Sequence, residues 1–146
     1  MDRAFEEISH ILDANRDKRV CIVGTFCCGK STLAIRLPGL RDMDEIVFPK
    51  LSDDEASSVK QTWAPDVGRA MAGLARRHVS INPGEAVIGT VLFDCDLVVR
   101  LRISDELLRE RTTNRGAGFE DAKRLDSAIA DEAAGSGLPV IEVDLG

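Results

Sequence analysis

The chain has 146 residues, of which 44% are hydrophobic and 30% charged, and its formal net charge is −6. This profile is typical of one soluble globular domain covering residues 1–146, and no window approaches the 18 or more apolar residues of a membrane span. The acidic balance argues against polynucleotide binding without excluding it, because affinity for nucleic acid depends on neutralising phosphates.

Four cysteines are present, Cys21, Cys27, Cys28 and Cys95, without the C-x-x-C spacing of a zinc site. Adjacent Cys27 and Cys28 do not form an ordinary disulfide. We therefore expect reduced thiols in a reducing compartment. The first residues are charged and lack the apolar core of a signal peptide, which also favours a cytoplasmic protein.

Amphipathic segments alternate with short apolar runs along the chain. The expected helices span residues 2–15, 30–37, 52–63, 66–77, 104–113 and 119–134, and the expected strands span residues 19–23, 45–48, 78–82, 97–103 and 139–143. Strands that alternate with helices predict a three-layer α/β/α fold with a mostly parallel sheet.

The most specific motif follows the first expected strand. Residues 24–31, Gly-Thr-Phe-Cys-Cys-Gly-Lys-Ser, match the phosphate-binding (Walker A) pattern G-x-x-x-x-G-K-[ST] at every fixed position. Such a loop turns backbone N–H groups toward phosphate oxygens, and the following helix directs its positive end at the same place. Lys30 supplies a cation for the β- and γ-phosphates, Ser31 a hydroxyl for Mg²⁺, and Thr32 a contact for the α-phosphate. The residues expected to bind the nucleotide are Gly24, Thr25, Phe26, Cys27, Cys28, Gly29, Lys30, Ser31 and Thr32.

The absence of other motifs narrows the class of nucleotide-binding protein. A GTPase needs Asn-Lys-x-Asp, but the nearest stretch, residues 114–117, reads Asn-Arg-Gly-Ala. Transporter and helicase ATPases need longer chains and a clear Walker B acid. A small kinase remains, which moves the γ-phosphate of Mg-ATP to a nucleoside, nucleotide or other small hydroxyl or phosphate acceptor.

Asp42 and Asp44 lie about ten residues beyond the loop, next to the expected second strand. If this segment is extended, both carboxylates point to one side. Near a γ-phosphate, one would orient Mg²⁺ through water and the other would take the proton of the acceptor hydroxyl, with Asp44 the stronger candidate. The alternative is a solvated acidic loop.

Arg111 and Arg115 lie four residues apart at the end of an expected helix, so they share a helical face. Two guanidinium groups there would neutralise charge on the transferring phosphoryl group. The loop 114–118 would act as a short lid, about residues 111–119, because a lid needs mobile hinges. The ordinary explanation is that basic residues favour helix C-termini through the helix dipole.

In this order of motifs, the chain resembles the small nucleoside and nucleotide kinases, the adenylate kinase and shikimate kinase group. The resemblance covers nearly the whole layout, but only the phosphate-binding loop is highly specific. It implies a five-stranded parallel sheet of order 2-3-1-4-5 and makes Lys30, Ser31, Asp44, Arg111 and Arg115 the phosphoryl-transfer set. The family often has an Asp or a glycine cluster at the end of the third strand, where this chain is expected to have residues 80–84, Ser-Ile-Asn-Pro-Gly.

The acceptor site is expected at the helical pair of residues 52–77. Trp63 would stack on a base or sugar, or else fill core between the helices, and Arg69 would hold an acceptor phosphate, or else lie on the surface. Asp44 would face the same acceptor. Two alternatives stay open: a kinase acting on a modified base or an end of DNA, and a non-catalytic ATP-binding regulatory module.

Overall fold

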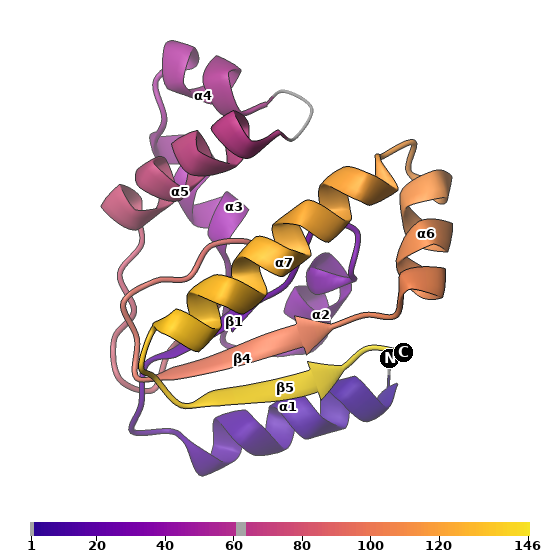
Figure 1. Cartoon of the computed structure of the whole chain (residues 1–146). Helices are drawn as coiled ribbons and strands as arrows, with labels where there is room; N and C mark the ends of the chain where they lie inside the picture. Colours follow the sequence, from indigo (N-terminus) through magenta and orange to yellow (C-terminus); the bar gives the residue numbers. More distant parts are fainter. Residues whose placement is uncertain (1, 61–63) are drawn as a thin grey trace.

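The structure is a computed structural model that describes residues 2–60 and 64–146. Its centre is an all-parallel sheet of five strands in the order β2-β3-β1-β4-β5. The neighbouring strands β4 and β5 are labelled in Figure 1. The strands are β1 (Val20–Val23), β2 (Leu40–Asp42), β3 (Ala86–Gly89), β4 (Leu97–Arg102) and β5 (Val140–Asp144). The α/β class, the parallel sheet and the strand order expected from the sequence are therefore confirmed.

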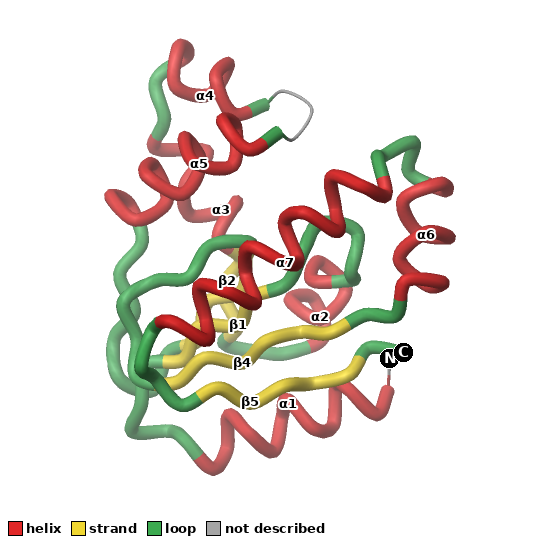
Figure 2. Tube along the Cα trace, in the orientation of Figure 1, coloured by secondary structure: helices red, strands yellow, loops and turns green. Residues whose placement is uncertain are grey.

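Helices cover both faces of this sheet, as Figure 2 shows for the described residues. They are α1 (Asp2–Ala14), α2 (Lys30–Arg36), α3 (Met43–Val47), the 3₁₀ turn η1 (Phe48–Lys50), α4 (Asp53–Val59), α5 (Pro65–His78), α6 (Asp105–Asn114) and α7 (Phe119–Gly135). Within residues 2–60 and 64–146, none of them combines the length and apolar character needed to cross a bilayer.

The core has two halves because successive residues of a strand face opposite sides of the sheet. Val20 and Ile22 of β1 pack in a cluster with residues of α1 and α2. Cys21 and Val23 pack on the other side with residues of α3, α5 and α7. All four β1 residues are buried, which explains why the sequence reads as a continuous apolar run.

The second and third strands were predicted in the wrong places. Residues 45–48 lie in α3 and the start of η1, and the strand is the three-residue segment Leu40–Asp42 just before them. The Asp42 side chain accepts a hydrogen bond from the Asp44 N–H, so it caps α3 and ends β2. Residues 78–82 are the end of α5 and a loop, and the strand follows at Ala86–Gly89 after the turn at Gly84.

Candidate active site

The phosphate-binding motif forms a tight loop between the end of β1 and the start of α2. The Gly24 N–H donates to the Gly89 carbonyl at 3.1 Å, so the loop begins as an extension of the sheet. A Cβ atom at Gly24 would lie 2.8 Å from Cys28 Sγ, so this position needs glycine for space. The left-handed turns come instead from Gly29, with φ of 108°, and from Cys27, with φ of 64°. A non-glycine residue in this conformation is a local strain of the kind found at ligand-binding loops.

The loop is also held from the side of α7. Thr25 is fully buried, and its hydroxyl donates to the Ala122 carbonyl at 2.7 Å. Phe26 is partly buried and packs against both halves of the core. These contacts fix the loop against the helix that follows the lid segment in sequence.

Two cations converge on the loop. Lys30 Nζ donates to the Thr25 carbonyl at 2.5 Å and lies 3.8 Å from Cys28 Sγ. Arg111 Nη1, from α6, donates to the Cys28 carbonyl at 2.5 Å. Within the described part of the chain, neither cation is within 4.0 Å of a carboxylate oxygen. Their charge is therefore available to an anion that enters the loop.

Ser31 and Thr32 lie exposed in the first turn of α2, and Gly29 provides no side-chain cap for this helix. The residues described contain no group of three His, Cys, Asp or Glu side chains placed to hold a metal ion. The exposed hydroxyl of Ser31 fits Mg²⁺ that arrives with a nucleotide, because Mg²⁺ keeps several waters and takes only one or two protein ligands beside phosphate oxygens. Ser31, exposed at the start of α2, would supply one such ligand.

Asp42 and Asp44 are adjacent, but not for the predicted reason. Asp42 ends β2 and caps α3, whereas Asp44 belongs to the first turn of α3, so the expected shared extended segment is wrong. Asp44 is exposed at the wall of a cavity. Partial desolvation raises the pKa of Asp44, the charge of Asp42 raises it further, and the positive charge of Lys30 opposes both. Asp44 therefore lies within electrostatic reach of Lys30.

The predicted lid is the α6–α7 connection. Arg111 lies in α6 and contacts the loop, whereas Arg115 caps the end of α6 and is exposed. Arg109 of the same helix stacks on the Phe119 ring at 3.9 Å and is held at the base of α7. The structure thus brings Arg111, but not Arg115, into contact with the phosphate-binding loop.

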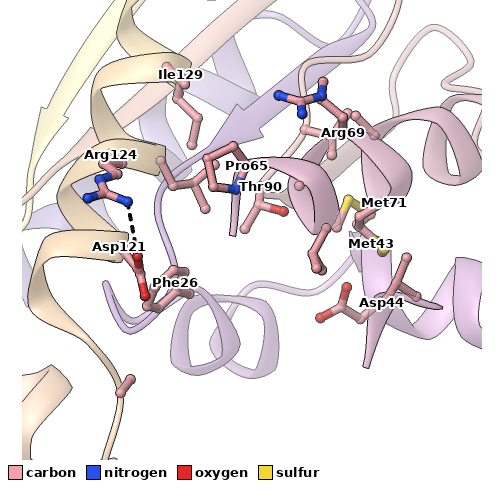
Figure 3. A pocket seen from close by; sticks show the side chains of 18 of the residues that line it. Phe26, Met43, Asp44, Pro65, Arg69, Met71, Thr90, Asp121, Arg124 and Ile129 are labelled. Atoms are coloured by element: carbon pink, nitrogen blue, oxygen red, sulfur yellow. Dashed lines mark ion pairs between the residues drawn. The ribbon is translucent and has the colours of Figure 1, made fainter. Parts of the chain in front are cut away.

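A cavity of about 740 Å³ opens beside the loop. Figure 3 shows its walls: Phe26 of the loop, Met43 and Asp44 of α3, Pro65, Arg69 and Met71 of α5, Thr90 after β3, and Asp121, Arg124 and Ile129 of α7. Residues 116–118, within the segment predicted to be a lid, also border it. Its volume lies in the range of about 300–1,000 Å³ that is usual for small-molecule sites.

The predicted acceptor residues meet this cavity in part. Asp44 and Arg69 line it, and Arg69 is ion-paired with Asp66 at 2.9 Å on the exposed face of α5. Trp63 lies outside the described residues. Sequence reasoning missed Thr90, because the third strand was expected about eight residues too early.

No carboxylate follows the third strand directly. β3 ends at Gly89 and continues with Thr90, and the next acids, Asp94 and Asp96, both bind Arg19. Arg19 and Asp96 precede β1 and β4, so this ion-paired group lies at the edge of the sheet opposite the phosphate-binding loop. At the end of the third strand, where the small nucleoside and nucleotide kinases often have an acid, this chain therefore has glycine and threonine.

A scan against protein-family models and a search of curated proteins both find no match for the chain.

Proposed function

We propose that this protein is a small kinase of the P-loop NTPase fold, which transfers the γ-phosphoryl group of Mg-ATP to a small acceptor. The observation that carries the proposal is the arrangement of three parts: the phosphate-binding loop, the two cations that contact it, and the cavity beside it. The side chains of Lys30 and Arg111 both contact backbone carbonyls of the G-x-x-x-x-G-K-S loop, and a cavity with Asp44 in its wall opens beside the loop. The loop with its two cations suits a triphosphate, and the cavity suits a second substrate.

The chain's own residues have distinct roles in this proposal. The backbone N–H groups of the loop and Lys30 bind the β- and γ-phosphates, and Arg111 neutralises charge that develops on the transferring group. Asp44 accepts the proton of the acceptor hydroxyl. Ser31 would hold Mg²⁺ that arrives with the nucleotide, and this ion would neutralise phosphate charge.

Lys30→Ala tests the proposal, with Lys18→Ala as the matched control because Lys18 is an exposed lysine before β1. ADP release from Mg-ATP is measured across nucleosides, nucleoside monophosphates, shikimate-like alcohols and single-stranded DNA. We expect Lys30→Ala to lower acceptor-stimulated turnover by about 10²-fold or more, as for loss of a group that stabilises transition-state charge. Tight ATP binding without stimulation by any acceptor would instead indicate a non-catalytic ATP-binding module.

A further inference from the structure

The charges on the cavity wall balance each other. Among the described residues that line it, three are acids and three are arginines: Asp44, Asp121, Glu132, Arg69, Arg76 and Arg124. This balance differs from the phosphate-binding loop, where the partners of Lys30 and Arg111 among residues 2–60 and 64–146 are backbone carbonyls and the thiol of Cys28.

Each cavity arginine already has a carboxylate partner. Arg76 of α5 is ion-paired with Glu132 of α7, and Arg76 Nε also donates to the Leu92 carbonyl at 3.2 Å. Arg124 lies 3.8 Å from Asp121 on α7 (Figure 3). A dianionic phosphate monoester entering this cavity would compete with these carboxylates for the arginine donors, and it would meet the like charges of Asp44, Asp121 and Glu132 on the same wall.

The remaining surface of the cavity suits an uncharged, flat molecule. Phe26 and Phe48 provide aromatic surface, and Met43, Met71 and Ile129 provide aliphatic surface. Thr90 adds a hydroxyl that both donates and accepts hydrogen bonds. Apolar walls with a few polar groups are the usual design of a site that binds a small organic molecule.

We propose that the acceptor is a neutral alcohol with a flat apolar body, of the nucleoside type, and not a molecule that already carries a phosphate. This inference rests on the proposed kinase function. The acceptor oxygen forms a bond to the γ-phosphorus while the bond from that phosphorus to the β–γ bridging oxygen breaks. The hydroxyl proton passes to the Asp44 carboxylate, and ADP leaves with both electrons of the broken bond.

Equilibrium binding tests this inference separately from catalysis. With a non-hydrolysable Mg-ATP analogue present, each common nucleoside is titrated against its own 5′-monophosphate, and also as a unit of a short single-stranded oligonucleotide. We expect at least one free nucleoside to bind tenfold or more tightly than its monophosphate. The inference would be overturned if the monophosphate bound equally or more tightly, if neither compound bound, or if binding occurred only within the oligonucleotide. The kinase proposal is tested separately, by binding of the ATP analogue and by the Lys30→Ala variant.

A charge variant checks that ion pairing is the cause of the selectivity. Glu132→Gln removes the partner of Arg76, so the affinity for the 5′-monophosphate should rise by about three- to fivefold relative to the nucleoside, the range of a partly exposed ion pair. Glu120→Gln, an exposed acid in the first turn of the same helix, should leave the ratio unchanged. An unchanged ratio in Glu132→Gln would contradict the proposed origin of the selectivity.

Discussion

Asp44 is the residue through which pH should control phosphoryl transfer in this proposal. Partial desolvation and the charge of Asp42 raise its pKa above the ordinary value of 3.8, although Lys30 opposes the shift. Transfer needs the ionised carboxylate, so kcat/KM should fall on the acid side with a midpoint above that ordinary value. Asp42→Asn keeps a side-chain cap on α3 but removes a negative charge, so this midpoint should move to lower pH.

Two further variants complete the pH experiment. Asp44→Asn should lose most transfer, and Asp131→Asn, an exposed acid of α7, should leave the profile unchanged. Because the folded state binds the Asp44 proton more tightly than the unfolded state, stability contributed by this group falls as pH rises from 3.8 through the raised pKa. Asp44→Asn should therefore not lower the melting temperature at pH 7. If kcat/KM of Asp44→Asn still fell at low pH with the same midpoint, the titrating group would be a residue other than Asp44.

Arg111 and Arg115 should behave differently although the sequence places them on one helical face. Arg111 contacts the loop carbonyl of Cys28, so Arg111→Ala should weaken Mg-ATP binding and lower turnover together. Arg115 is exposed at the end of α6, whereas Arg111 contacts the loop, so ATP binding should be largely kept in Arg115→Ala. If Arg115 meets the phosphoryl group only during its transfer, as predicted from the sequence, the same variant should lower kcat by about 10-fold or more. Titration calorimetry and steady-state kinetics separate the two effects, and equal loss of binding in both variants would make Arg115 a ground-state contact.

The residues of the phosphate-binding loop could be predicted because their spacing is itself the signal. What the spacing did not indicate is that Cys27, and not Gly24, takes a left-handed conformation, and that Gly24 is required for space beside Cys28. Backbone conformation at a variable position depends on the packing around it, which the sequence of the loop alone does not contain.

At the scale of elements, α3 is held against β3 by a close contact at Gly89. A Cβ atom there would lie 2.6 Å from Met43 Cβ, in the residue just before Asp44. Gly89→Ala should destabilise the fold by about 1–3 kcal/mol through overpacking and should also lower kcat, because α3 must move. Chemical denaturation and kinetics measure both effects.

Gly73→Ala is the matched control for this glycine substitution. Gly73 lies within α5, and a Cβ atom there meets nothing within 4 Å. Alanine should stabilise this helix by about 0.5–1 kcal/mol. If both variants destabilised the protein equally, the contact between Gly89 and Met43 would not explain the loss.

The two misplaced strands show where the sequence pattern was insufficient. Ile46, Val47 and Phe48 have the composition of a strand, but the cap from Asp42 and the burial of Met43 and Val47 on one side favour a helix. β2 has only three residues, too few for a period to be recognised. The strand order was nevertheless correct, because it was taken from the resemblance and does not depend on where each strand begins.

At the scale of the whole molecule, the cavity joins parts of the chain that are distant in sequence. Met43, Thr90 and Ile129 come from three different segments, yet they line one space beside the loop (Figure 3). The sequence predicted the donor side because one contiguous motif carries it. It predicted only Asp44 and Arg69 on the acceptor side, because that side exists only once α3, α5 and α7 are packed on the same face of the sheet.

In the proposed reaction, a phosphoryl group leaves ATP and arrives on an acceptor. Phosphorus NMR of the protein with Mg-ATP and the tightest-binding acceptor follows both ends of this reaction in one sample. We expect the γ-phosphate signal to be replaced by the signals of ADP and of a new phosphomonoester, and Lys30→Ala to leave the ATP spectrum unchanged. An ATP spectrum that stays unchanged with the native chain, or the appearance of inorganic phosphate without any phosphomonoester, would contradict the proposed reaction.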